Sequence, residues 1–267
     1  MNTDRIKQKF EDIRREGRPG LIVFLTVGVP DLEATMELVP ALVEAGADGI
    51  ELGVPFSDPL GDGPVIQESN FKALQRGVSL VDCFETVEKL RGKVPDTPLV
   101  FMGYYNSIYN YGLDGFGEEA RRVGLDGVIA IDLPHDEVKP LALECEPRGV
   151  HIIPLLAPTS TEESVKAACA DATGFIYCVS LTGVTGARDQ VASGGLDLVD
   201  RARAGTTVPL AVGFGISKRE HVVDVCRKAD AAVVGSALVR VMLESPRGQL
   251  IKRASRLVAE LAGKPVS

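Results

Sequence analysis

The sequence has 267 residues, 45% hydrophobic and 25% charged, which is the composition of a water-soluble folded protein with a substantial core. Its formal net charge of −8, without a cluster of lysine and arginine, argues against a nucleic acid as a partner, because binding to phosphate backbones needs concentrated positive charge. Five cysteines without C-x-x-C spacing, a polar first ten residues and no apolar run of membrane-spanning length predict a cytoplasmic protein with reduced thiols, not secreted and not in a membrane.

The chain begins with an expected helix over residues 4–16, because Ile6, Phe10 and Ile13 recur at spacings of four and three. Thr3 is its expected N-cap. Eight short apolar strands follow, over residues 21–27, 47–54, 98–104, 127–133, 151–157, 174–180, 208–214 and 231–234. Helices are expected between and after them, over residues 31–45, 69–75, 80–91, 113–123, 136–145, 160–170, 196–204, 217–228 and 250–262.

Several local signals mark the helix ends. Asp31 and Ser217 are expected N-caps, and Ser160 with Glu163 forms an expected capping box. Pro40 should kink the helix in which it lies.

Eight strand-helix units in about 250 residues agree with the number of units and the length of a (β/α)₈ TIM barrel. No linker or shift in composition marks a boundary, so residues 1–267 are expected to form a single domain, an α/β barrel with an extra N-terminal helix. An open doubly wound sheet has the same periodicity and remains an alternative. A dinucleotide-binding version of it is disfavoured, because the Gly-x-Gly-x-x-Gly pattern is missing after the first strand.

The most informative stretch is residues 51–67, where the second strand ends and a loop begins. On an extended strand Gly49, Glu51 and Gly53 face one side, so a carboxylate points the same way as two residues that have no side chain. Empty space beside an ionisable group suits a ligand pocket and not a close-packed core. The loop is shaped by proline and glycine, and we expect it to carry Asp62 back over the strand end towards Glu51.

Polar residues and glycines gather where the expected strands end, which is the face of a barrel that carries the active site. They are Thr26, Glu51, Asp62, Tyr104, Asn106, Asp132, Tyr177, Thr182, Thr185, Gly186, Gly213, Gly215, Gly235 and Ser236. Three glycine-rich stretches, 183–186, 213–217 and 235–237, would expose backbone N–H groups at helix N-termini, where the helix dipole favours an anion. One such stretch could serve only a tight turn, but three together favour a phosphate site.

The residue types that are absent from the strand ends exclude some classes of reaction. No lysine lies in or at the end of an expected strand, so a Schiff-base aldolase would have no amine to use. His135, His151 and His221 are too few and too scattered for a metal-dependent aldolase or epimerase, and no metal site is expected. Cys178 alternates with Tyr177 and should face the helices, which argues against a nucleophilic role.

Glu51 and Asp62 remain as the candidate catalytic pair. Glu51, at the barrel mouth among apolar side chains, should have a raised pKa and could accept and donate a proton near neutrality. Asp62, on a wetter loop, should stay ionised and could accept a hydrogen bond from a ligand N–H. The competing interpretations are a buried Glu51 paired for structural reasons, and an Asp62 that only forms a turn before Gly63.

Residues 50–67 closely resemble a signature of the α chain of tryptophan synthase. That signature is Leu-Glu-Leu-Gly-x-Pro-Phe-Ser-Asp-Pro-x-Ala-Asp-Gly-Pro-x-Ile-Gln, which is matched here with Ile50 in place of Leu and Gly61 in place of Ala. The resemblance continues through the three glycine-rich stretches in the same order, so it covers nearly the whole chain.

The resemblance implies the retro-aldol cleavage of indole-3-glycerol phosphate to indole and glyceraldehyde 3-phosphate. In that family the residue matching Glu51 protonates indole C3 and helps to deprotonate the glycerol hydroxyl. The residue matching Asp62 accepts the indole N–H and stabilises positive charge on the ring. The other expected substrate-binding residues are Phe24, Tyr104, Tyr177 and Phe214 around the indole, Gly186, Gly215, Gly235 and Ser236 around the phosphate, and Thr26 and Thr185 at strand ends.

The resemblance also implies a partner, a β chain that uses pyridoxal phosphate to join indole to serine in an αββα assembly, with no cofactor in this chain. Residues 55–62 and 181–195 correspond to loops that face the partner and gate the site, and the second is expected to be mobile until ligand orders it. Leu181 stands where some members carry arginine. Any charged contact that this arginine makes when the loop closes is therefore not expected here. Gly61, next to Asp62, should loosen its loop slightly.

Three other functions fit parts of the pattern. A stand-alone indole-glycerol-phosphate lyase would share the chemistry but would not be strongly activated by a β chain. A non-catalytic subunit that holds a phosphorylated ligand would not need both Glu51 and Asp62. A phosphosugar isomerase on the same barrel would use the carboxylates for a 1,2 proton shift, and the identity of the substrate would distinguish it.

Overall fold

The computed structural model describes residues 4–179, 191–213 and 215–265, without the side chains of residues 191–195. The strands are β1 (Gly20–Thr26), β2 (Gly49–Gly53), β3 (Leu99–Gly103), β4 (Gly127–Ala130), β5 (His151–Ile152), β6 (Leu155–Leu156), β7 (Ile176–Val179), β8 (Leu210–Gly213) and β9 (Ala231–Val234). The α-helices are α1 (Arg5–Glu16), α2 (Leu32–Ala45), α3 (Pro64–Gln75), α4 (Leu80–Arg91), α5 (Tyr105–Tyr111), α6 (Leu113–Val123), α7 (Lys139–Cys145), α8 (Glu162–Asp171), α9 (Val191–Arg203), α10 (Arg219–Val225), α11 (Ser236–Glu244) and α12 (Leu250–Ala262). Three short 3₁₀ helices are η1 (His135–Glu137), η2 (Glu146–Arg148) and η3 (Arg247–Gln249).

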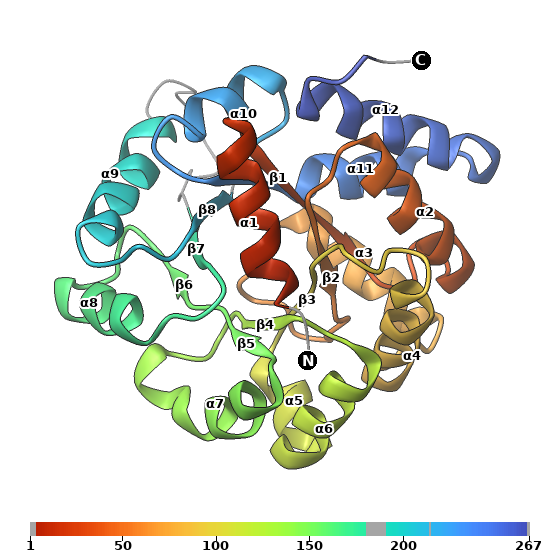
Figure 1. The fold of residues 1–267 in the computed structure, drawn as a ribbon. Coiled ribbons are helices and arrows are strands. Elements are labelled where there is room, and N and C mark those ends of the chain that lie inside the picture. The colour runs from red at the N-terminus through yellow and green to blue at the C-terminus, as the bar shows by residue number, and fades with distance from the viewer. Residues whose placement is uncertain (1–3, 180–190, 214, 266–267) are drawn as a thin grey trace.

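The described strands form one parallel sheet in the order β5-β4-β3-β2-β1-β9-β8-β7-β6. Its two end strands, β5 and β6, are separated only by Ile153 and Pro154, so the chain itself carries the sheet from one end to the other. The Ile153 N–H donates to the Val128 carbonyl at 2.9 Å, and the Tyr177 N–H donates to the Pro154 carbonyl at 2.9 Å. The sheet therefore closes into the predicted TIM barrel, with helices around its outside (Figure 1).

The expected fifth strand, 151–157, is two strands of two residues each. Proline has no backbone N–H and cannot donate to a neighbouring strand, so Pro154 interrupts the hydrogen-bonding pattern. Before this residue the chain pairs with β4, and after it with β7. The pairing of this segment therefore changes from β4 to β7 at Pro154.

Alternate residues of each strand face either the helices or the barrel interior. In β2, Ile50 and Leu52 pack in the core between strands and helices. Glu51 is in register with Phe24 of β1 and Val100 of β3, and Val100 belongs to the interior cluster. Residues in register on parallel strands face the same side, so Glu51 faces the interior, as the sequence predicts.

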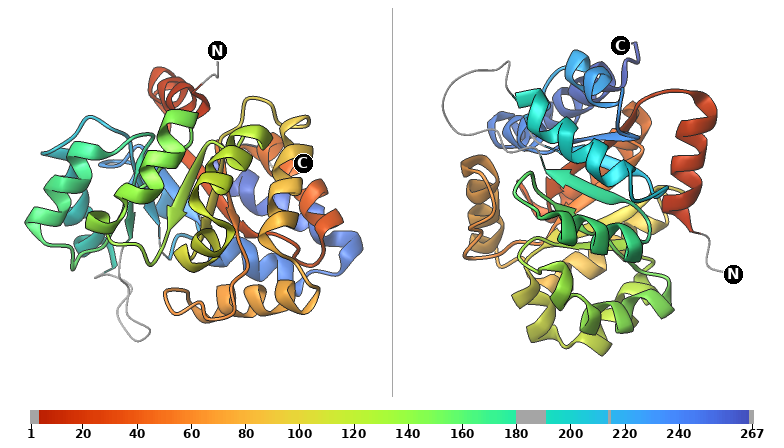
Figure 2. Two further views of the ribbon diagram at one scale, coloured as in Figure 1. Left: turned by 90° about the horizontal axis from the view of Figure 1, so that it is seen from below. Right: turned by 90° about the vertical axis from the view of Figure 1, so that its left-hand side faces the viewer.

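Helices cover both ends of the barrel as well as its sides. Figure 2 shows α1 (red) across one end and α3 (orange) across the other. Helix α1 buries Ile6, Phe10 and Ile13 in the interior cluster, and the Phe10 ring lies 5.8 Å from that of Phe175. This confirms the extra N-terminal helix and leaves the end near α3 as the face where the strands terminate.

Three aspartates, each directly before a strand, organise the end that α1 covers. Asp48 precedes β2, Asp126 precedes β4 and Asp230 precedes β9. Each carboxylate accepts a backbone N–H from the start of the neighbouring strand, at 2.9, 2.8 and 2.8 Å, from Leu21, Leu99 and Leu210 respectively. Each also pairs with an arginine of the N-terminal region: Arg18, Arg5 and Arg14 respectively. Residues 5–18 are thereby fixed to strands from both halves of the chain.

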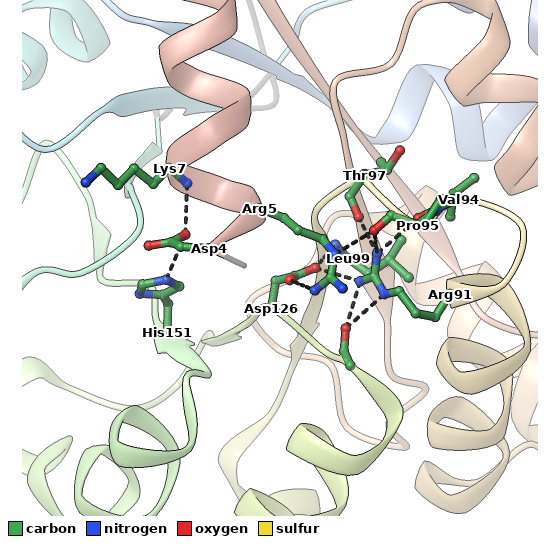
Figure 3. Close-up of polar contacts among 11 residues, drawn as sticks. Asp4, Arg5, Lys7, Arg91, Val94, Pro95, Thr97, Leu99, Asp126 and His151 are labelled. Carbon is green, nitrogen blue, oxygen red and sulfur yellow. Dashed lines mark hydrogen bonds and ion pairs between the residues drawn. The ribbon is translucent and has the colours of Figure 1, made fainter. Parts of the chain in front are cut away.

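Asp126 joins two arginines from different parts of the chain (Figure 3). It is buried, and it accepts hydrogen bonds from Arg5 Nη1 at 2.9 Å and Arg91 Nη2 at 2.7 Å. Nearby, His151 Nε2 lies 3.3 Å from Asp4 Oδ1, and this hydrogen bond lowers the pKa of Asp4. His151 therefore has a structural role at this end of the barrel.

Replacing Asp126 by Ala should lower the free energy of unfolding by about 3–5 kcal/mol, because two guanidinium groups and a buried N–H would lose their acceptor. Urea denaturation would measure the loss. Asp224→Ala, which removes an exposed pair with Arg227, is the control and should cost less than about 1 kcal/mol. Equal losses in the two variants would contradict this role.

Some expected helix starts are wrong. Asp31 caps α2 as predicted, accepting the Ala34 N–H at 2.6 Å. The expected capping box of Ser160 and Glu163 does not form, because the Ser160 hydroxyl accepts the Ala157 N–H at 3.0 Å and Thr161 caps α8 instead.

Other differences affect helix ends and one missed helix. Thr3 lies outside the described residues, and Asp4 caps α1 by accepting the Lys7 N–H at 2.9 Å. Ser217 does not cap α10, which begins after Lys218. Helix α3 begins earlier than expected, at Pro64, which is a favourable first helical position. Helix α5 was not expected, because its sequence lacks apolar periodicity.

Candidate active site

Glu51 lies fully buried at the floor of the site, inside the barrel. Neither carboxylate oxygen has a hydrogen-bond partner among the residues that the structure describes. Burial raises the pKa of Glu51 from 4.5 to about 8. The expected raised pKa is thus supported, and no residue that the structure describes pairs with Glu51 for structural reasons.

Asp62 reaches the site from the loop between β2 and α3. Burial raises its pKa from 3.8 to about 6, while the hydrogen bond from Tyr104 acts in the opposite direction. Asp62 is partly exposed and Glu51 is fully buried, so the Asp62 loop is the wetter of the two settings, as expected, although neighbouring side chains cover part of the carboxylate. Asp62 nevertheless remains mostly ionised at pH 7, so the pair combines a protonated Glu51 with a charged Asp62.

Tyr104 fixes the position of the Asp62 loop. Its hydroxyl accepts the Gly61 N–H at 2.9 Å and donates to Asp62 Oδ2 at 3.3 Å. Its ring stacks on Phe56 with centroids 4.8 Å apart. A Cβ atom at Gly61 would lie 2.9 Å from Ile131 Cγ2, so glycine suits this close approach of the loop to the barrel.

Asn70 of α3 is a site residue that the sequence analysis missed. Its amide nitrogen lies 3.5 Å from Asp62 Oδ2 and 3.0 Å from the Ile66 carbonyl, and its amide oxygen accepts the Phe56 N–H at 3.2 Å. One buried side chain thus joins both ends of the loop. The only signal in the sequence is a polar residue on a helix face that turns out to be buried.

Thr26, at the end of β1, is buried and lies within hydrogen-bond distance of α3. Its hydroxyl is 2.6 Å from that of Ser69, which also donates to the Ile66 carbonyl at 2.8 Å. The expected site residue Thr26 therefore helps to hold α3, and with it the Asp62 loop, over the barrel.

Tyr177 and Phe24 fill the interior beside glycines. A Cβ atom at Gly213 would collide with the Tyr177 hydroxyl, and one at Gly53 would lie 2.5 Å from Phe24 Cζ. Burial raises the pKa of Tyr177 well above its usual value, and the charges of Glu51 and Asp62 raise it further. Tyr177 is therefore close to both carboxylates.

Gly213→Ala should displace the Tyr177 ring and lower the free energy of unfolding by about 1–3 kcal/mol, because this part of the interior has no room for the methyl group. Thermal unfolding would measure the effect. Gly248→Ala, where the added atom would meet no neighbour within 4 Å, is the control and should change stability by less than about 1 kcal/mol. A Gly213 variant as stable as this control would refute the steric argument.

The described part of the expected phosphate site lies at the start of α11. Gly235 precedes this helix and Ser236 begins it, so the free N–H groups of its first turn lie at the strand-terminal face. A Cβ atom at Gly235 would make ordinary contacts, 3.6 Å from Phe24 Cβ and 3.8 Å from Ile66 Cδ1. Gly215 has a left-handed φ of 69°. Thr185, Gly186 and Phe214, with Leu181 and Thr182, lie outside the described residues.

The remaining expected positions have other contacts. Asp132 accepts the Tyr105 N–H at 2.7 Å at the start of α5, and His135 pairs with Asp171 at 3.2 Å. Cys178 packs in the cluster between β7 and the helices, as predicted. Within the described ranges, no three histidine, cysteine, aspartate or glutamate side chains are grouped as metal ligands, and no helix is long and apolar enough to cross a membrane.

Comparison with known proteins identifies the family. The family model described as "Tryptophan synthase alpha chain" matches residues 10–263. The chain belongs to the tryptophan synthase alpha chain family.

Curated members of the tryptophan synthase alpha chain family are similar over almost their full length. The protein of that name from Thermoanaerobacter sp. (strain X514) is 44% identical over 97% of this chain and 98% of its own. The structure of tryptophan synthase subunit alpha from Legionella pneumophila str. Paris has a TM-score of 0.89 and 31% identity, covering 98% of both chains. A chain of the tryptophan synthase complex from Pyrococcus furiosus has a TM-score of 0.84 and 40% identity, covering 91% of this chain and 98% of that one.

Proposed function

We propose that this protein is the α subunit of a tryptophan synthase and cleaves indole-3-glycerol phosphate to indole and glyceraldehyde 3-phosphate. The observation that carries the proposal is the buried Glu51 on the barrel floor, which has no hydrogen-bond partner within the described part of the chain, with Asp62 brought over the same interior by its loop. No lysine stands at the end of an expected strand to form a Schiff base, so the cleavage would proceed by proton transfer.

Glu51 would serve as both acid and base. Because its pKa of about 8 keeps it protonated at neutral pH, it can donate a proton to C3 of the indole ring. The carboxylate that results can accept the proton of the glycerol hydroxyl as the carbon–carbon bond breaks. The electrons of that bond return to the ring, the hydroxyl carbon becomes the aldehyde, and Glu51 is protonated again.

Asp62 would stabilise the ring while it carries positive charge. Its carboxylate, held by Tyr104, would accept the indole N–H and so oppose the charge that C3 protonation creates. We assign Phe24, Tyr104, Tyr177 and Phe214 to the indole, with Thr26 and Thr185 beside them. The phosphate would bind to backbone N–H groups of Gly186, Gly215, Gly235 and Ser236, aided by the dipole of α11.

The two carboxyl groups predict a bell-shaped dependence of kcat/KM on pH. Asp62 must be ionised, so activity should rise through pH 6, and Glu51 must be protonated, so activity should fall through pH 8. Steady-state rates of indole release between pH 5 and 9.5 would test this shape, and a profile that keeps rising above pH 8 would contradict the role of Glu51 as acid.

We further propose a β chain as partner, with pyridoxal phosphate bound there and no cofactor in this chain. Large apolar side chains are exposed on the Asp62 loop and on two helices: Leu60 on the loop, Phe71 on α3 and Tyr109 on α5. Exposed apolar groups at one face are typical of a protein interface. Five free cysteines fit a cytoplasmic protein, and the pairing of β1 with β9 fits one domain over residues 1–267.

The deciding experiment is indole release from indole-3-glycerol phosphate by the purified chain, with and without a β chain loaded with pyridoxal phosphate. Slow release that rises strongly with the partner is the expected result. Fast release without the partner would favour a stand-alone lyase. Folded protein that releases no indole under either condition would refute the proposed reaction.

A further inference from the structure

A cavity of about 630 Å³ lies in the side of the barrel, between α7 and α8. Neither Glu51 nor Asp62 lines it, so it is separate from the candidate active site. Its floor is the stretch 152–156, where the fifth strand is split, and its sides come from the helices that flank this stretch in Figure 1.

The cavity exists because both layers of the barrel are thin at this point. In the inner layer, Pro154 interrupts the wall between β5 and β6. In the outer layer, three of the side chains that line it are small: Ala142 from α7, and Ala167 and Ala168 from α8. The same helices also supply the charged Lys139 and Asp171. His135 and Asp171, 3.2 Å apart, connect the two sides at the rim.

The lining combines an apolar floor with a mouth rich in carboxylates. Ile152 and Leu156 pack in the clusters between strands and helices and form this floor, whereas Ile153 and Leu155 belong to the barrel interior cluster. The charged residues around the mouth are Asp136, Glu146 and Asp171, with Lys139 and His135. Burial raises the pKa of Glu146, the charge of Asp171 raises it further, and His151 acts in the opposite direction. Glu146 and Asp171 line the same cavity, so a ligand bound there meets both negative charges.

The volume, the apolar floor and the carboxylates of the cavity together indicate which kind of ligand would bind there. The volume lies within the range of small-molecule sites, and the floor offers apolar contact without hydrogen-bonding groups that need a partner. A positive charge between Glu146 and Asp171 would be attracted to both carboxylates, whereas a negative charge would be repelled by both.

We propose that this cavity is a second small-molecule site, which binds a compact apolar ligand carrying one ammonium group. The apolar body packs on Ile152 and Leu156, and the ammonium group lies between Glu146 and Asp171. This site does not depend on the function proposed for Glu51 and Asp62.

The test uses three probes that share a phenyl ring: phenethylamine, neutral 2-phenylethanol and anionic 3-phenylpropionate. Titration of the full chain, followed by NMR of the alanine methyl groups, would give both affinity and location. We expect phenethylamine to bind about fivefold more tightly than the alcohol and to shift the methyl signals of Ala142, Ala167 and Ala168. Equal affinities for the three probes, or shifts confined to other residues, would overturn the proposal.

Matched variants separate the site from general surface binding. Ala167→Phe fills the mouth and should abolish phenethylamine binding, whereas Ala170→Phe, exposed on the same helix but outside the cavity, should not change it. Glu146→Gln should weaken the amine about threefold to fivefold without affecting the alcohol, and Glu163→Gln on α8 is its control. The melting temperature of each variant shows whether it is folded, and undiminished binding by a folded Ala167→Phe would refute the location.

Discussion

Replacement of Glu51 by Gln should lower the rate of indole release by about 10²–10⁴-fold, because the amide can neither donate the proton to indole C3 nor accept one from the hydroxyl. Substrate affinity should change little, since the amide occupies the same buried volume. Single-turnover rates and equilibrium binding to the folded variant would measure the two effects separately. Glu118→Gln, at an exposed position of α6, is the control and should retain the full rate. Wild-type turnover by Glu51→Gln would remove this residue from the mechanism.

The same substitution should also change stability in a way that depends on pH. The pKa of Glu51 is raised in the folded state from 4.5 to about 8, so its contribution to stability is complete below pH 4.5 and is lost as pH rises through 8. At pH 8.5 the folded protein must hold a buried charge, at a cost of roughly 5 kcal/mol at most. The Gln variant avoids this cost, so it should be more stable than wild type at pH 8.5 and equal to it at pH 4.

Replacement of Asp62 by Asn should reduce kcat by about 10²–10³-fold, because a neutral amide cannot oppose the positive charge that develops on the indole ring. The amide oxygen can still accept the indole N–H, so KM should change much less than kcat. Steady-state kinetics at pH 7 would separate the two parameters. A larger change in KM than in kcat would instead indicate that Asp62 serves ground-state binding.

Tyr104→Phe is the matched variant for Asp62. It removes the hydroxyl that donates to Asp62 and accepts from Gly61, but it keeps the ring that stacks on Phe56. Because this hydrogen bond lowers the pKa of Asp62, its loss should move the acidic limb of the pH profile to higher pH. The rate at pH 7 should fall far less than in Asp62→Asn.

The barrel could be predicted because its pattern is local. Alternation of buried strands with amphipathic helices is present in every part of the chain, and the last strand and helix match their expected ranges. The expected helix caps that were wrong depended on which of two neighbouring side chains binds a backbone group. Whether Ser160 or Thr161 caps α8 is decided by the bond that Ser160 makes to Ala157, which no window of sequence reveals.

The site was predictable where strand alternation alone places a residue. Gly49, Glu51 and Gly53 face the interior because every second residue of a strand does. The contacts of Asp62 were not predictable, because the side chains that cover it come from elsewhere in the chain. Tyr104 lies 42 positions away, and Asn70 reaches the loop only because α3 starts at Pro64.

The pairing of β1, near the start of the chain, with β9, near its end, has a consequence for synthesis on the ribosome. Every residue of β1 is buried, yet one edge of this strand pairs with β9, and Arg14 finds its partner in Asp230. The second edge of β1 therefore stays uncovered while roughly 200 further residues are made, which takes about 10–40 s at typical rates of translation. An unpaired apolar strand edge is a site for aggregation. The newly made chain thus depends on rapid completion, or on a chaperone, to protect the strand from which Phe24 and Thr26 later enter the site.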